Sequence, residues 1–96
     1  MDKNKSLTIE KALNLALKNQ QEGKTVIALK FYDQVLKIDR NHFQTLNNMG
    51  SIFFSLKEND KAIGCYEKLT KNNPNFAEAH NNLGVVFKTL GENQKA

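Results

Sequence analysis

The sequence predicts an all-α fold in which antiparallel helix hairpins stack in line. Within the chain, apolar residues recur at three- and four-residue steps, which is the spacing of an amphipathic helix. The chain also repeats with a period of 34 residues, which is typical of a stacked array rather than of one closed globule. Residues that keep this step are Leu15, Met49 and Leu83; Ala16, Gly50 and Gly84; Ala28, Ala62 and Ala96; Tyr32 and Tyr66; Phe53 and Phe87; Asn14, Asn48 and Asn82.

The first unit is predicted to contain two helices, from Ile9 to about Gln21 and from Thr25 to Ile38. Gly23 lies between them, where the end of a helix favours a residue that tolerates a left-handed backbone. The two helices therefore form a hairpin with a short turn.

The second and third units follow the same plan. Helices are expected from about Phe43 to Leu56 and from about Asn59 to Lys71, and the run 72–74 (Asn-Asn-Pro) ends the latter. The third unit begins at about Phe76 or Ala77, is expected to turn at Gly91, and breaks off at Ala96.

Small and aromatic residues at repeating positions predict how the helices pack. We expect Ala16, Gly50 and Gly84 to let two helices approach closely. Aromatic side chains would fill the space around this contact, namely Tyr32, Tyr66, Phe53 and Phe87.

From Ala77 to Ala96 the sequence reads A-E-A-H-N-N-L-G-V-V-F-K-T-L-G-E-N-Q-K-A, which resembles the tetratricopeptide repeat family. Windows at 9–42, 43–76 and 77–96 align without a gap, and residues 1–8 remain as a polar N-terminal segment. The resemblance implies a right-handed superhelical α-solenoid of about two and a half units, closest to the array of O-linked N-acetylglucosamine transferase-like proteins. Pentatricopeptide arrays, which read RNA, lack the Leu-Gly, aromatic and Ala pattern.

The sequence departs from the family pattern at a few positions. Asn19 stands where an aromatic residue is usual, Lys57 replaces the turn glycine, and Arg40 replaces the closing proline. Val35 and Leu69 occupy a position that the family usually fills with alanine.

Length and composition argue against a multidomain, disulfide-bonded, membrane-spanning or secreted protein. Ninety-six residues allow one small domain, and the single cysteine, Cys65, cannot form an internal disulfide. No stretch approaches the ~20 apolar residues of a membrane span, and the lysine-rich start does not resemble a signal peptide. A cytoplasmic protein is expected.

The third hairpin is expected to have its first helix, while its second has barely started by Ala96. Leu83, Val86, Phe87 and Leu90 are therefore expected to lack the cover of a following helix. We expect the chain to be the N-terminal piece of a longer array. The alternative is self-association through this uncovered C-terminal face.

The resemblance implies that the first helix of each hairpin lines a concave groove. The groove set is Glu10, Leu13, Asn14, Leu17, Gln20, Gln21, Gln44, Asn47, Asn48, Ser51, Phe54, Ser55, Glu78, Asn81, Asn82, Val85, Lys88 and Thr89. It is nearly neutral, so the net charge of +4 lies mostly elsewhere. It also lacks the clustered basic and stacking aromatic residues of a nucleic-acid channel. We expect peptide binding at Asn14, Asn47, Asn48, Ser51, Asn81, Asn82 and Val85.

The asparagines at 14, 48 and 82 are the sharpest functional signal. A side-chain amide both donates and accepts hydrogen bonds, so a row of amides could hold the backbone of an extended peptide. O-linked N-acetylglucosamine transferase has a similar asparagine ladder. The alternative is structural, with each amide bonded to a neighbouring turn or helix backbone. Both interpretations stay open at this point.

Repeats that clamp acidic carboxyl-terminal tails offer a poorer match. At the clamp positions this chain has Leu13, Leu17, Asn48, Glu78 and Asn82. Only Asn48 fits the clamp pattern, and Glu78 would repel a carboxylate.

Catalytic and metal chemistry are not indicated. His42 and His80 lie far apart without ligand-spaced partners, and we expect His80 to be a partly buried packing residue. Cys65 is expected to be inert packing. The glycines are isolated, so no phosphate-binding loop is present. We expect no cofactor, no metal and no catalysis in these residues.

Two functions are consistent with the sequence. The first is a protein–protein interaction scaffold that binds an extended peptide or a partner helix. The alternative is the N-terminal, substrate-recruiting part of a larger glycosyltransferase or sulfotransferase, whose catalytic domain would follow these residues.

Overall fold

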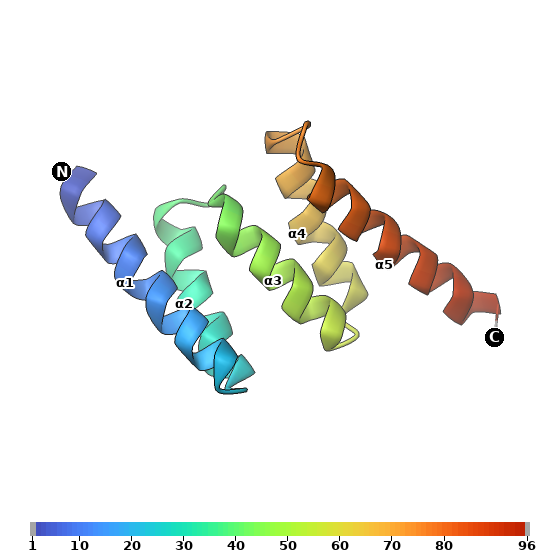
Figure 1. Ribbon diagram of the computed structural model, residues 1–96, viewed down its shortest axis with the longest axis horizontal. Helices are drawn as coiled ribbons and strands as arrows, with labels where there is room; N and C mark the ends of the chain where they lie inside the picture. The colour runs from blue at the N-terminus through green and yellow to red at the C-terminus, as the bar shows by residue number, and fades with distance from the viewer. Residues whose placement is uncertain (1, 96) are drawn as a thin grey trace. The chain divides into compact units, whose positions relative to one another are not determined.

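The computed structural model describes the backbone of residues 2–95 and the side chains of residues 8–92. Within these residues the chain forms helices and turns and no strand. The helices are α1 (Asp2–Gln21), α2 (Thr25–Ile38), α3 (Phe43–Ser55), α4 (Asn59–Asn72) and α5 (Ala77–Lys95) (Figure 1). The prediction of an all-α chain of helical hairpins is confirmed.

The chain divides into two compact units, one up to Thr45 and one from Leu46 onward. In the first unit α1 packs along α2, as an antiparallel hairpin (Figure 1). The second unit contains most of α3 together with α4 and α5, and α4 packs on α5.

Most helix ends lie where the sequence predicts them. The bounds of α2 are those predicted, and α3 and α4 each end within one residue of the expected position. Two predictions are wrong. Helix α1 begins at Asp2 rather than at Ile9, and neither glycine nor proline interrupts residues 2–21.

The second error concerns Gly91, which does not form a turn. Helix α5 continues through it to Lys95. A glycine inside a helix costs only ~1 kcal/mol relative to alanine. A turn would break helical hydrogen bonds, and no second helix among the described residues packs there to compensate. The helix therefore continues.

The turns after α1 and α3 have the same geometry. The amides of Gly23 and Lys24 donate to the carbonyls of Gln20 and Asn19, at 3.1 and 2.8 Å. The amides of Lys57 and Glu58 donate to the carbonyls of Phe54 and Phe53, at 3.0 and 2.8 Å. Both turns are Schellman motifs, in which one residue adopts a left-handed backbone to satisfy the last carbonyls of the helix.

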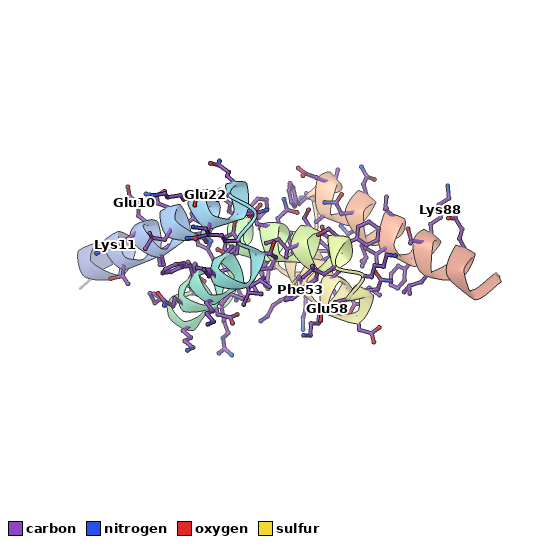
Figure 2. The ribbon with its side chains drawn as sticks, turned by 90° about the horizontal axis from the view of Figure 1, so that it is seen from below. Glu10, Lys11, Glu22, Phe53, Glu58 and Lys88 are labelled. Atoms are coloured by element: carbon purple, nitrogen blue, oxygen red, sulfur yellow. The ribbon has the colours of Figure 1, made fainter. Side chains whose placement is uncertain are left out.

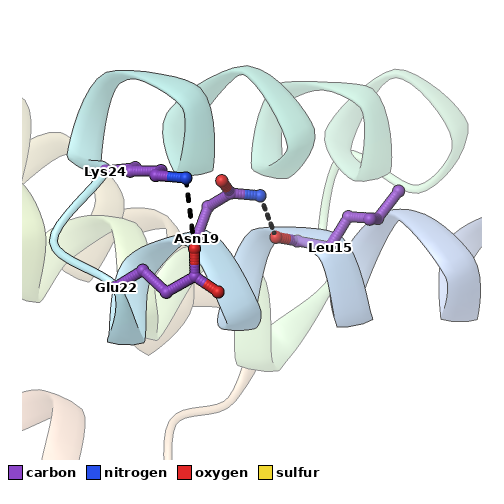
Figure 3. A network of polar contacts seen from close by, with 4 residues as sticks. All are labelled: Leu15, Asn19, Glu22 and Lys24. Carbon is purple, nitrogen blue, oxygen red and sulfur yellow. Dashed lines mark hydrogen bonds and ion pairs between the residues drawn. The ribbon is translucent and has the colours of Figure 1, made fainter.

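Polar contacts around the first of these turns stay local (Figure 3). Asn19 donates from its side-chain amide to the carbonyl of Leu15 on its own helix, at 2.8 Å. The ammonium of Lys24 lies 3.2 Å from the carboxylate of Glu22, and both groups are exposed. An exposed ion pair of this kind contributes little to stability.

Lys57 holds a conformation that disfavours side chains. Its φ is 63°, whereas the residue at the matching position of the first turn is Gly23, with a φ of 78°. A left-handed backbone costs a residue with a Cβ atom ~1–2 kcal/mol, and glycine avoids this cost. Part of the stability gained by a change to glycine is lost again, because glycine makes the unfolded state more flexible. We expect Lys57→Gly to raise the free energy of unfolding by ~0.5–1 kcal/mol. Chemical denaturation measures the change, and an unaltered or lower midpoint would contradict it.

The turns after α2 and α4 also match each other. The amides of Asp39 and Asn73 bond the carbonyls of Val35 and Leu69, at 2.8 and 2.9 Å. A four-residue turn then follows in each unit, closed by His42 onto Asp39 and by Phe76 onto Asn73. Arg40 therefore forms the same turn in the first unit that Pro74 forms in the second.

The buried residues keep the period of the sequence. The residues that are fully or almost fully buried include Ala12, Ala16, Ala28, Tyr32, Val35, Leu46, Met49, Ile52, Ala62, Tyr66, Leu69, Ala79 and Val86. Five pairs in this set are spaced by one repeat, namely Ala12 with Leu46, Ala28 with Ala62, Tyr32 with Tyr66, Val35 with Leu69, and Ile52 with Val86.

Close helix approach is observed at Gly50 but not at Gly84. A Cβ atom on Gly50 would lie 2.7 Å from ring atoms of Tyr66, so α3 and α4 meet at this glycine. A Cβ atom on Gly84 would meet nothing within 4 Å, and Phe87 is 50% exposed. The prediction that Gly84 and Phe87 pack in a close contact is therefore wrong for the described residues, because no further helix lies against them.

The expected lack of cover on α5 is only partly observed. Val86 is buried, and Leu83 and Leu90 are half-buried. The buried side of α5 includes Ala79 and Val86, which are seven residues apart, and α5 packs on α4.

Among the described helices, none is both long enough and apolar enough to cross a membrane.

Candidate functional site

A cavity of about 350 Å³ lies in the unit from Leu46 onward. Its lining comes from α3, α4 and α5, namely Asn47, Asn48, Ser51, Phe54, Tyr66, Glu78, Asn82 and Val85. The volume falls within the range of ~300–1,000 Å³ that is typical of small-molecule sites.

Helical spacing brings these side chains onto common faces. On α3, Asn47, Ser51 and Phe54 are separated by four and three residues, so they share one side of the helix. On α5, Glu78, Asn82 and Val85 have the same spacing. Each helix therefore presents polar groups and one apolar side chain to the cavity.

Two amides of the lining have unused hydrogen-bonding capacity. The side-chain oxygen of Asn47 is buried and has no hydrogen-bond partner. The half-buried side chain of Asn82 makes no hydrogen bond to any other residue that the structure describes. A buried polar atom without a partner costs ~1–3 kcal/mol, so it favours a guest whose donor can reach it.

Tyr66 contributes a phenol from α4. Its counterpart one repeat earlier, Tyr32, donates its hydroxyl to the side-chain oxygen of Gln20. The residue one repeat after Gln20 is Phe54, which has no acceptor. Tyr66 therefore lacks the acceptor that Tyr32 has, and it lines the cavity instead.

The surroundings of Tyr66 raise the pKa of its hydroxyl. Burial raises the pKa of the phenol above its usual value, and the negative charges of Cys65, when ionised, and of Glu78 raise the pKa further. At neutral pH the hydroxyl is therefore a hydrogen-bond donor. The sequence interpretation missed this residue, although the replacement of glutamine by phenylalanine at Phe54 is a signal that could have identified it.

The structure brings together five of the seven predicted site residues: Asn47, Asn48, Ser51, Asn82 and Val85. Phe54 and Glu78, from the wider groove set, also line the cavity.

The other two predicted residues lie elsewhere. Asn81 is exposed and does not line the cavity. Asn14 is exposed on α1, where it lines a different, open pocket with Glu10, Lys11 and Leu15. Figure 2 shows Glu10 and Lys11 on α1 and Lys88 on α5.

The histidines have structural contacts. His42 precedes α3, and its Nδ1 lies 2.9 Å from the Thr45 hydroxyl and accepts from the Thr45 amide at 3.4 Å, as an N-cap would. The prediction that His80 is partly buried is wrong. It is exposed, and its Nε2 lies 2.8 Å from the carbonyl of Pro74.

Phe53 and Cys65 lie outside the lining of the cavity. The ammonium of Lys61 lies 5.5 Å from the ring centre of Phe53, at the end of the α3–α4 hairpin that Figure 2 marks with Phe53 and Glu58. Cys65 is a half-buried thiol that forms no disulfide with another described residue. Within the described residues, no group of three His, Cys, Asp or Glu side chains could hold a metal ion.

Residues 50–91 match the family model of the TPR repeat. This stretch, a little under half of the chain, is similar to a tetratricopeptide repeat. Most of the cavity lining falls in the matched stretch, and Asn47 and Asn48 lie two to three residues before it. No curated protein matches the chain in sequence.

Solved structures with tetratricopeptide repeats are similar to this chain. One is the C-terminal TPR-containing domain of a Plasmodium falciparum protein described as an FK506-binding protein, with a TM-score of 0.81 and 27% identity. Another is the MamA protein, with a TM-score of 0.82 and 26% identity. The alignments cover 99% and 91% of this chain but only 63% and 48% of those chains. The finer resemblance to transferase arrays stays a prediction.

Proposed function

We propose that this chain is a protein–protein interaction scaffold that binds an extended peptide segment of a partner protein. The peptide would lie on the cavity formed by α3, α4 and α5. The observation that carries the proposal is that residues predicted from the sequence to contact peptide, from two different helices, line one cavity. Tetratricopeptide repeats are consistent with an interaction role.

The chemistry of the lining suits a peptide backbone. Each peptide unit offers one N–H donor and one carbonyl acceptor. The side-chain amides of Asn48 and Asn82 line the cavity, and an amide of this kind carries both donor and acceptor groups. Asn47 adds an acceptor that lacks a partner. Phe54 and Val85 supply apolar contacts for a side chain of the guest.

Asparagines with a structural role behave differently in this chain. Asn19 and Asn73 each donate to a carbonyl four residues earlier, at 2.8 and 3.2 Å. Asn82 makes no such bond within the described residues, which supports a role for its amide in ligand binding. The continuation of the asparagine row to Asn14 stays a prediction.

The double substitution Asn48→Ala and Asn82→Ala tests the proposal. Each amide is expected to contribute ~1 kcal/mol or more to binding, so the affinity for peptide should fall by at least about tenfold. Affinity would be measured by calorimetric titration with a peptide selected from a random library. Thermal unfolding of the same variant shows whether the array stays intact.

Asn81→Ala is the matched control. It removes the same group from the same helix, but Asn81 is exposed and outside the cavity. We expect this variant to bind peptide as tightly as the native chain. Unchanged affinity in the double variant would contradict the proposal, and a much lower melting temperature would instead assign the two asparagines a structural role.

The alternative of a recruiting segment in a larger transferase stays a prediction. Nothing in the described part of the chain favours it over a scaffold, and a peptide-binding cavity is compatible with both. The cytoplasmic location and self-association through α5 likewise stay predictions.

A further inference from the structure

The walls of the cavity carry charge of one sign. Glu78 is the charged residue among those that line it, and its side chain is exposed on the first turn of α5. The ion pairs among the described residues join Lys24 to Glu22 and Lys61 to Glu58, so Glu78 has none. The cavity therefore contains an uncompensated carboxylate.

Hydrogen-bond acceptors stand beside this charge. The buried oxygen of Asn47 has no donor, and the hydroxyl of Ser51 can accept as well as donate. The aromatic ring of Phe54 lies in the same lining and offers a face that attracts cations. These groups together favour a guest that brings donors and a positive charge.

The negative charge of Glu78 on α5 acts on Tyr66 of α4. Its charge contributes to the raised pKa of Tyr66, after burial and the charge of Cys65. Tyr66 and Glu78 come from different helices and both line the cavity. A carboxylate and a phenol therefore share this lining. Lys88, on the same helix as Glu78, does not line the cavity.

We propose that the cavity accepts a basic side chain, arginine or lysine, of the bound peptide. The cationic group would pair with the Glu78 carboxylate, donate to the Asn47 oxygen and lie against the Phe54 ring. The asparagines would meanwhile hold the peptide backbone. This inference rests on the proposed peptide-binding function and names the class of peptide that the cavity prefers.

Three matched peptides test the charge preference. Each is an acetylated, amidated nonapeptide of serine and alanine with arginine, citrulline or glutamate at its centre. Citrulline keeps the shape of arginine and removes the charge. Titration followed by the NMR signals of the Asn48 and Asn82 side-chain amides should show arginine binding about threefold to tenfold more tightly than citrulline, and glutamate binding most weakly. The arginine preference should shrink as salt is raised.

Glu78→Gln should reduce the ratio of arginine to citrulline affinity to about one, because the variant keeps the size and shape of the side chain and loses its charge. Glu67→Gln is the matched control, since Glu67 is an exposed carboxylate on α4 that does not line the cavity. Its ratio should equal that of the native chain.

The outcomes separate the two proposals. Equal affinity for the arginine and citrulline peptides would overturn the charge preference and leave peptide binding standing. So would an arginine preference that survives in Glu78→Gln. If no peptide of the three shifts the Asn48 and Asn82 signals, peptide binding at this cavity is itself wrong.

Discussion

Replacing Gly50 by alanine is expected to destabilise the protein, although the same change normally stabilises a helix. The new methyl group would lie 2.7 Å from two ring atoms of Tyr66. Tyr66 is only 3% exposed, so displacing its ring would disturb buried contacts. Overpacking of this kind typically costs ~1–3 kcal/mol, more than the helix propensity gained. Urea denaturation would measure the loss as a lower midpoint.

Gly84→Ala is the matched control, one repeat later in the sequence. A Cβ atom there meets nothing within 4 Å, so only the better helix propensity of alanine acts. The free energy of unfolding should rise by ~0.5–1 kcal/mol. The two identical substitutions should therefore have effects of opposite sign. Stabilisation by Gly50→Ala would show that α3 and α4 do not meet at this glycine as described.

Leu69→Ala is expected to lower the free energy of unfolding by ~2–5 kcal/mol. Leu69 is fully buried in α4, so truncation leaves a cavity and removes apolar contacts. The resemblance to the family alone suggests the opposite, because alanine is usual at this position. Chemical denaturation distinguishes the two expectations, since the family argument predicts little change.

Leu56→Ala provides the same chemical change at an exposed site. Leu56 follows α3 and is 47% exposed, so its truncation should alter the free energy of unfolding by no more than ~0.5 kcal/mol. If Leu69→Ala were as mild as this control, the packing around α4 would have to be looser than the structure shows.

The helices could be predicted because their signals are local. Gly23 marks the first turn, and its φ of 78° shows why glycine suits that position. Lys57 forms the same turn without glycine, because the hydrogen bonds that close it involve only the backbone. The prediction of a turn at Gly91 was wrong because glycine allows a turn but does not require one. Whether the chain turns there depends on a packing partner.

The site could be predicted only in part. Asn47, Asn48, Ser51, Asn82 and Val85 were identified by their repeat positions, and the structure places them around one cavity. Asn81 and Asn82 are neighbours in the sequence, yet only Asn82 lines the cavity, because successive residues of a helix point in different directions.

The sequence by itself determined the 34-residue period, the helical hairpins and the face of each helix that carries the asparagines. These follow from spacing along one chain, which a sequence states directly. Only the tertiary structure decided that Tyr66 opens onto the cavity, that Gly50 is closely packed while Gly84 is open, and that Glu78 lies there without an ion pair to any residue whose side chain is described. Each of these depends on which side chains of different helices meet, and that is set by packing rather than by any local pattern.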